Sequence, residues 1–590
     1  MSDKVISPFL TLPVELVYRV LDHLKIITIF ASCRNVCTRL DTIIDTYQRY
    51  QTLTKLNFSR QTFNGQKMQR LCYTLQNNTI ITELDLSRNI IDCHSAQYLA
   101  AVLQTNHTVT ILNLSQNHIE SRGAQYIANM LRINQTLTEL QLSENNINSN
   151  GMQYLAEALE NNKSLRRLSL LYTPIGERGL EYLANALKIN KTLTELELSH
   201  NGLDGGGGQH IGNILRYNNT LIELSSTNNP IHPNGVKYIA DGLAVNNTLV
   251  TLHLGYNGID CQGVIFLVKA LEKNHSLTSL NLFSSHIQNE GMQYLSDALK
   301  HNRTLTTLII PGTGIDADGA QYVADALQNN NTLTMLNLCS NPIRNQGVQY
   351  LAKALENNTT LTTLYISAIS MSVEGVNALT SGLRNNRGLK ILHLEKSGME
   401  TDGVQDLFNA LQYNHTLTTL NIGVNRFGPD PMQYLANALI YNTTLTTISL
   451  VLNWIGPRGA EYLAKALETN STLTTLILTL NAIGVEGAKH IANALVHNKS
   501  LTTLDLASNK IETEGTRYIA NALLNNKTLK TLSFGNNDIG LEGAKCLVNA
   551  LLSNETLAML KFSEKDASAD GSQYLQDMSL YFTANVTWSK

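Results

Sequence analysis

The chain has 590 residues, of which 43% are hydrophobic and 6% aromatic, and its formal net charge at pH 7 is -3. Binding to nucleic acid through phosphate neutralisation needs clustered Lys and Arg side chains, so this charge balance predicts no nucleic-acid partner. Apolar runs long enough to cross a bilayer are missing from the sequence, which predicts no membrane partner.

The cysteines and the first residues indicate the compartment. The seven cysteines are odd in number and scattered over different sequence contexts, as is typical of free thiols in a reducing environment. The first sixteen residues, MSDKVISPFLTLPVEL, lack a basic region followed by an apolar core, so they do not predict a secretory signal. We expect a cytoplasmic protein, with the nucleus as the alternative.

Residues 1–50 predict two short amphipathic helices ahead of a repetitive region. Four apolar residues recur at four-residue steps on one helical face: Leu12, Leu16, Val20 and Leu24. Pro13 suits the first turn of that helix. A second apolar set indicates another helix: Val36, Leu40, Ile43 and Ile44. Only residues 48–52 follow before the first repeat strand, too few for a flexible linker.

This segment resembles an F-box, whose pattern is matched by Leu12, Pro13, Glu15, Leu16, Leu24, Val36, Cys37 and Arg39. It departs from the pattern at Leu40, where the family usually has Trp, and at residues 25–29, which replace a polar link. The resemblance implies contact with the small adaptor of a cullin ubiquitin ligase through Leu12, Pro13, Leu16, Val20 and Leu24. The alternative is that these helices only cap the repeats, because an open repeat array must shield its exposed core.

From residue 53 to about residue 584 the chain repeats every 28 residues, 19 times, without an insertion or deletion. The period is visible at one leucine position, which includes Leu56, Leu84, Leu112, Leu140, Leu168, Leu196, Leu224 and Leu252. A fixed period of this length predicts a solenoid, in which each unit buries its apolar face against its neighbours.

Each unit predicts a short strand, a turn and a helix. The spacing L-x-x-L-x-L places alternate side chains on one face of a strand. In the third unit Ala124, Ile127 and Leu131 form the apolar stripe of a helix. Gly123 stands at the bend into this helix, where the absence of a Cβ permits close packing. The helices end at Asn134 and its equivalents, where we expect a left-handed cap.

The pattern L-x-x-L-x-L-x-x-N with one helix per 28 residues resembles the leucine-rich repeat of the ribonuclease-inhibitor-like class. The resemblance implies an α/β fold: a curved horseshoe or superhelix with a parallel sheet inside and helices outside. We expect three parts: the F-box-like helices and cap over 1–50, the solenoid over 51–556, and a last repeat with a C-terminal cap over 557–590. Functions vary widely among such proteins, so the fold alone names no reaction.

The asparagine after each strand predicts a buried ladder. Asn89, Asn117 and Asn145 should point inward at the turn, where an unpaired amide costs about 1–3 kcal/mol. Each amide is therefore expected to bind backbone groups of its own and neighbouring units. The pattern is interrupted at Thr173, Ser285, Thr313, Ile369 and Ser397.

Two stretches of the predicted inner wall are candidate binding surfaces. The first third is acidic through Glu83, Asp85, Glu139, Glu144, Glu195, Glu197 and Glu223. This pattern is typical of a solvated polar face. A second hypothesis is that these acidic side chains bind a basic segment of a partner. Further on, apolar and aromatic residues occupy outward positions, and exposed apolar patches mark interaction sites. We expect a protein on the concave face to contact His253, Tyr256, Phe283, Tyr365, His393, Leu452, Trp454 and Leu480.

Enzymatic signatures are missing from the sequence. It has no G-x-x-x-x-G-K-[ST] and no H-E-x-x-H, and the run Gly205 to Gly208 is not followed by a phosphate-binding lysine. We therefore expect no enzyme, no cofactor and no metal. The first hypothesis is a substrate-recognition subunit of an adaptor–cullin ubiquitin ligase. The alternative is a ligase-independent scaffold or inhibitor, and the third is a regulator of a small GTPase.

Overall fold

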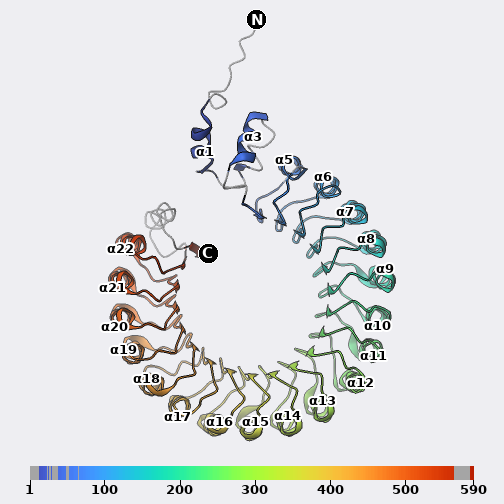
Figure 1. Cartoon of the computed structure of the whole chain (residues 1–590). Coiled ribbons are helices and arrows are strands. Elements are labelled where there is room, and N and C mark those ends of the chain that lie inside the picture. Colours follow the sequence, from blue (N-terminus) through green and yellow to red (C-terminus); the bar gives the residue numbers. More distant parts are fainter. Residues whose placement is uncertain are drawn as a thin grey trace. The chain divides into compact units, whose positions relative to one another are not determined.

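The computed structural model describes residues 12–22, 24, 28–29, 38–47, 52–63, 65–76, 78–563 and 585–589. The chain divides into two compact units, Met1–Ser285 and His286–Lys590. Within each unit the row of repeats curves, with short strands on its inner side and helices on its outer side (Figure 1).

Two helices of the first unit precede its repeats, α1 (Val14–Asp22) and α3 (Thr38–Thr46). The rings of Tyr18 and Tyr47 stack with centroids 4.9 Å apart, and the guanidinium of Arg39 donates to the carbonyl of Leu12 at 2.6 Å. Helix α1 is shorter than the sequence predicted, so Leu12 and Leu24 lie beyond its ends. Val36 and Cys37 lie outside the described residues.

The repeats of the first unit carry three-residue strands that pair in parallel. They are β1 (Lys55–Asn57), β2 (Glu83–Asp85), β3 (Ile111–Asn113), β4 (Glu139–Gln141), β5 (Arg167–Ser169), β6 (Glu195–Glu197), β7 (Glu223–Ser225), β8 (Thr251–His253) and β9 (Ser279–Asn281). Their helices are α5 (Gly65–Gln76), α6 (Cys93–Leu103), α7 (Ser121–Ile133), α8 (Ser149–Asn161), α9 (Gly176–Ile189), α10 (Gly205–Tyr217), α11 (His232–Leu243) and α12 (Cys261–Leu271). Leu84 stands opposite Leu112, one period away.

The second unit continues the same alternation. Its strands are β10 (Thr307–Ile309), β11 (Met335–Asn337), β12 (Thr363–Tyr365), β13 (Ile391–His393), β14 (Thr419–Asn421), β15 (Thr447–Ser449), β16 (Thr475–Ile477), β17 (Thr503–Asp505), β18 (Thr531–Ser533), β19 (Met559–Ser563) and β20 (Asn585–Ser589). Its helices are α13 (Gln288–His301), α14 (Ala317–Asn329), α15 (Arg344–Asn357), α16 (Val373–Asn385), α17 (Thr401–Leu411), α18 (Pro431–Tyr441), α19 (Gly456–Leu467), α20 (Gly484–His497), α21 (Glu512–Asn525) and α22 (Gly540–Ser553). In the last pair Leu560 stands opposite Val586, so the 28-residue spacing ends there.

The repeated leucines form the core. Leu84, Leu112 and Leu140 are each at most 1% exposed, because each is the middle residue of a three-residue strand and its side chain points into the core. Burying such a side chain contributes about 1.5–3 kcal/mol. The α/β solenoid predicted from the period is confirmed, with parallel strands and one helix per repeat.

The asparagine ladder after the strands is confirmed where hydrogen bonds are described. The amide nitrogen of Asn145 donates to the carbonyls of Leu114 and Leu142 at 2.9 and 3.0 Å. Its amide oxygen accepts the N–H of Ile119 at 3.0 Å. Each such asparagine therefore joins two repeats. At the interruption Ile369, the side chain is buried and makes no such bridge, since it carries no polar atom.

The prediction of a left-handed cap at the end of each helix was wrong. Asn134 has φ -67° and ψ 125°, an extended conformation. Its side-chain nitrogen donates to the carbonyl of Leu103 at 2.7 Å, and its oxygen accepts the N–H of Leu137 at 2.8 Å. The side chain thus satisfies the open end of the preceding repeat's helix, so no left-handed residue is needed there.

Left-handed residues occur instead in the turns after the strands, and in every repeat from Arg60 to Asn536 one lies just before the ladder position. We call this position the turn row: Arg60, Arg88, Gln116, Glu144, Tyr172, His200, Asn228, Tyr256 and Ser284 in the first unit, and Gly312, Ser340, Ala368, Lys396, Val424, Leu452, Leu480, Ser508 and Asn536 in the second. All have φ between 50° and 62°. The backbone turns back here toward the helix, and the side chains of the row project from the edge of the sheet.

The glycine near the start of most repeat helices allows close packing, as predicted. A Cβ on Gly151 would lie 2.8 Å from the side chain of Ile147 and 3.0 Å from the Cα of Ser121 in the preceding helix. Glycine is therefore needed here because a side chain would not fit between the two neighbouring helices.

Candidate functional site

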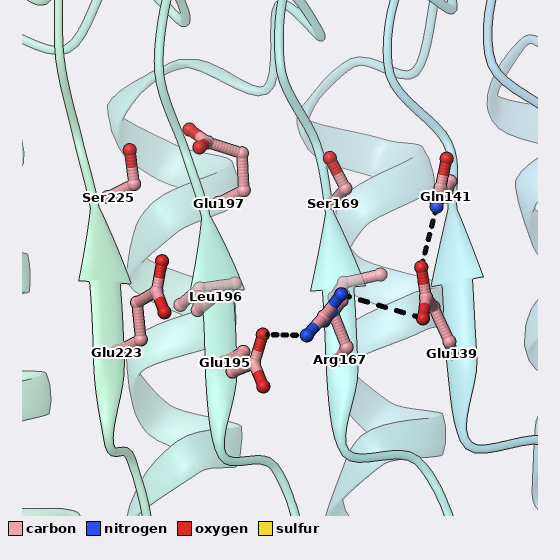
Figure 2. Close-up of a pocket in the computed structure, with 10 residues that line it drawn as sticks. Glu139, Gln141, Arg167, Ser169, Glu195, Leu196, Glu197, Glu223 and Ser225 are labelled. Carbon is pink, nitrogen blue, oxygen red and sulfur yellow. Dashed lines mark hydrogen bonds and ion pairs between the residues drawn. The ribbon is translucent and has the colours of Figure 1, made fainter. Parts of the chain in front are cut away.

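A shallow depression of about 380 Å³ lies on the sheet face of the first unit. Strands β4 to β7 supply its lining, which includes Glu139, Gln141, Arg167, Ser169, Glu195, Glu197, Glu223 and Ser225 (Figure 2). These are the residues on either side of the buried leucine of each strand, and the pleat directs them away from the core.

Arg167 is the single cation among these lining residues. Its guanidinium lies 2.5 Å from a carboxylate oxygen of Glu195 and 3.7 Å from one of Glu139, and Figure 2 shows it between the two. The hydrogen bond to Glu195 raises the pKa of Arg167 above its ordinary value. The arginine joins three neighbouring strands by charge.

The depression keeps an excess of negative charge. Four carboxylates, from Glu139, Glu195, Glu197 and Glu223, face one guanidinium. Glu197 accepts the backbone N–H of Ser199 at 2.7 Å, and Glu223 lies 3.7 Å from the Nε2 atom of His253. Four of the seven acidic residues expected on the inner wall therefore lie around one depression, where they favour cationic groups.

His253, Tyr365 and His393 end their strands and lie partly exposed on the sheet face. Tyr365 and His393 occupy paired positions of β12 and β13, and their rings stack at 4.3 Å. Burial lowers the pKa of His393, which the charge of Glu395 opposes. At neutral pH the imidazole is therefore uncharged and presents an aromatic face.

Tyr256 and Phe283 form a second aromatic pair, with ring centroids 6.3 Å apart. Tyr256 belongs to the turn row and is 58% exposed. Two residues of the same row escaped the sequence analysis: Tyr172 and His200, whose rings stack at 3.8 Å. The signal that identifies them is their distance from Tyr256, which is a multiple of the 28-residue period.

Leu452, Trp454 and Leu480 lie together at the turns that follow β15 and β16. Trp454 is 55% exposed and Leu480 45%, while Leu452 is partly exposed. The guanidinium of Arg426 lies 5.2 Å from the centre of the Trp454 ring, within the range of a cation–π contact. That these residues bind a partner stays a prediction.

The residues expected to bind an adaptor divide between exposed and covered positions. Leu16 and Val20 are exposed on α1 by 42% and 38%, and Pro13 is exposed before it. Leu12 and Leu24 are partly buried. The exposed pair is four residues apart, so one apolar stripe of α1 remains uncovered.

No group of three or more His, Cys, Asp or Glu side chains among the described residues could hold a metal ion. None of the described helices combines the length and apolar character needed to span a bilayer. Cys72, Cys93, Cys339 and Cys546 are free thiols, and burial raises the pKa of Cys72 to about 12.

Comparisons with known proteins identify the repeats. A family model described as "Leucine Rich repeat" matches eleven segments: residues 105–128, 134–156, 190–212, 245–268, 273–296, 301–324, 329–352, 441–464, 469–492, 497–520 and 525–548. Leucine-rich repeats indicate a protein-interaction module. A search of the curated proteins found no match.

Two solved structures are similar to parts of the chain. Actin-binding site 2 of leiomodin-1 is 30% identical over 20% of this chain and 70% of its own, with a TM-score of 0.20. A structure of the yeast Rad7 and Elc1 complex is 17% identical over 62% of this chain and 84% of its own, with a TM-score of 0.39. Both scores are low, so neither structure indicates what this chain binds.

Proposed function

We propose that this leucine-rich-repeat solenoid is the substrate-recognition subunit of an adaptor–cullin ubiquitin ligase. Helix α1 contacts the adaptor, and the sheet face and turn row of the repeats hold a protein substrate. The chain makes no bond itself, and it contributes by holding the substrate near the ubiquitin-charged enzyme.

The exposed stripe on α1 is the observation that carries the proposal. Leu16 and Val20 point to solvent, while Val17 and Leu21 of the same helix are at most 1% exposed. An amphipathic helix normally covers its apolar side chains, and an uncovered stripe at four-residue spacing favours a groove or helix of a partner.

The second helix holds α1 in place. The Tyr18 hydroxyl lies 3.1 Å from the Oγ1 atom of Thr46, next to the stacked Tyr18 and Tyr47 rings. The bond from Arg39 to the Leu12 carbonyl fixes the residues that precede α1. Preorganisation of this kind lowers the entropic cost of binding.

The test is co-purification of the full-length chain with the adaptor. The double variant Leu16→Ser, Val20→Ser should lose the adaptor, because it removes the exposed apolar stripe. The control is Glu15→Gln with Arg19→Gln, two exposed residues of the same helix, which should keep it. Both variants should retain the thermal unfolding midpoint, since all four side chains reach solvent. A wild-type chain that captures no adaptor contradicts the proposal.

The alternative, a ligase-independent scaffold or inhibitor, is favoured by the buried residues of the same segment. Leu21, Ile29 and Ile44 are fully buried, as expected of helices that cap a repeat array. In that case the Leu16→Ser, Val20→Ser variant captures the same proteins as the wild type. A chain that begins at residue 51 has a lower thermal unfolding midpoint.

A further inference from the structure

Three consecutive repeats of the second unit carry a large apolar residue in the turn row. Val424, Leu452 and Leu480 have φ of 61°, 52° and 61°. Elsewhere in this unit the row contains small, polar or charged residues: Gly312, Ser340, Ala368, Lys396, Ser508 and Asn536. Aliphatic side chains longer than alanine are therefore confined to three adjacent turns.

The left-handed conformation is unfavourable for these residue types. A β-branched or bulky residue in this region is a genuine outlier, and such a residue costs on the order of 1–3 kcal/mol. Asparagine tolerates the same conformation, and it occupies the row at Asn228 and Asn536. Stability of the turn alone would favour asparagine or glycine at all three positions.

The surrounding backbone imposes this conformation. The N–H of Leu452 donates to the carbonyl of Thr479 at 3.0 Å, and that of Leu480 donates to Ala507 at 3.0 Å. The next residue of each turn is held by the asparagine ladder, as where the N–H of Asn453 donates to Asn481 at 2.8 Å. Hydrogen bonds on both sides fix φ, so the aliphatic side chain has no part in forming the turn.

The side chains at these turns do not complete the core. Leu480 is 45% exposed, and Trp454, two residues after Leu452, is 55% exposed. We call Val424, Leu452, Leu480 and Trp454 the apolar ridge. Strain combined with exposure is characteristic of residues kept for contact with a ligand.

At two positions of the turns around the ridge, all the charged residues are of one sign. Between Lys396 and Lys510, the turn row and the position two residues after it contain three charged residues, and all are cations: Lys396, Arg426 and Lys510. Arg426 lies over the Trp454 ring. The carboxylate of Asp430, four residues after Arg426, is paired with Arg458 at 3.1 Å. A partner segment with carboxylates next to apolar side chains complements this arrangement.

We propose that the apolar ridge docks a short acidic and apolar segment of a partner protein, with large apolar side chains against Leu452, Leu480 and Trp454 and Asp or Glu side chains beside Lys396, Arg426 and Lys510. This inference rests on the protein-interaction part of the proposed function and specifies the partner's chemistry. It does not depend on the adaptor, because the ridge and α1 belong to different units.

The first measurement is the urea unfolding midpoint of turn-row variants, and its direction of change decides the outcome. The double variant Leu452→Asn, Leu480→Asn should raise the urea midpoint of the full-length chain, because asparagine relieves the strain. The matched control Ser508→Leu places a new aliphatic residue in the same row, and it should lower the midpoint. If the double variant lowers the midpoint, the leucines stabilise the fold and the proposal is overturned.

The second measurement tests binding with a displayed library of random peptides of about 12 residues. Peptides selected on the full-length chain should combine aromatic or aliphatic residues with Asp and Glu. Their affinity should fall at least about tenfold for the double variant and stay unchanged for Ser340→Asn, a turn-row residue outside the ridge. In a Trp588→Phe background, where Trp454 is the remaining tryptophan, bound peptide should shift its emission to the blue.

Several results would overturn the inference. They are a library without enriched sequences, enrichment of basic peptides, and peptides that bind the double variant as tightly as the wild type. A shift of Trp454 emission with vesicles of phosphatidylserine and phosphatidylcholine, but not with peptides, would assign the ridge to lipid instead. Adaptor capture measured on the same variants separates these outcomes from a failure of the proposed function.

Discussion

The backbone N–H of Asn453 donates to the side-chain oxygen of Asn481 across 2.8 Å, so a side chain of one repeat holds the main chain of the preceding repeat. The same relationship links Asn481 to Asn509 at 2.9 Å. The ladder therefore transmits order along the repeats, and each member supports the turn from which the turn row projects.

Replacing Asn481 with Ala should destabilise the second unit by about 3 kcal/mol, because it leaves several buried backbone groups without partners. The amide of Asn481 donates to the carbonyls of Leu450 and Leu478 at 2.8 and 2.9 Å. Hydrogen exchange should show the loss of protection in the repeats around β15 and β16. The control Asn385→Ala, at an exposed end of α16, should change little, and equal effects of the two variants would argue against the ladder.

Gly212, which lies in α10 beyond the run Gly205–Gly208, has a packing role that the sequence left open. A Cβ on Gly212 would overlap the carbonyl oxygen of Tyr238 in α11. Because backbone atoms cannot rotate aside, Gly212→Ala should lower the stability by about 1–2 kcal/mol, despite the better helix propensity of alanine. Gly205→Ala is the matched control in the same helix, where the nearest atom lies 3.8 Å away. Chemical unfolding of the two variants should separate them clearly.

His393 should titrate below its ordinary value of 6.5, because burial against Tyr365 disfavours the imidazolium. A group whose folded-state pKa is lowered stabilises the chain above its unfolded pKa and loses that contribution as the pH falls. Stability should therefore decline below pH 6.5 in the wild type. His393→Gln should reduce that decline. The NMR titration of the ring proton measures the pKa directly, and a midpoint above 6.5 would contradict this assignment.

Arg167 should affect the net charge of the depression more than it affects the free energy of unfolding. Its side chain is 50% exposed, so Arg167→Leu should change the free energy of unfolding by less than about 1 kcal/mol. The variant leaves four carboxylates unopposed in the depression and should speed association with a cationic probe such as oligolysine. This increase should disappear at high salt. The exposed neighbour Arg166 supplies the control, and an equal effect of Arg166→Leu would show that the position is unimportant.

The short period of the repeat made much of the molecule predictable. Leu84, Leu112 and Leu140 had to share one face, because alternation along a strand leaves a single arrangement that buries all three. The same regularity placed Asn145 inward, where a buried amide requires backbone partners. Tyr172 and His200 were overlooked because only the structure shows that these two residues, one repeat apart, stack on each other.

The amino-acid sequence by itself determined the repeat, its leucine core and its asparagine ladder, because each follows from local periodicity and from the need to pair buried polar groups. The parallel sheet was expected from the resemblance to leucine-rich repeats. Only the tertiary structure decided the conformation of the turns. It showed Asn134 extended and Leu452 and Leu480 left-handed, because hydrogen bonds from neighbouring repeats outweigh the preference of the individual residue. The ridge at Trp454 has the same origin, because the scaffold sets the backbone from which these side chains project.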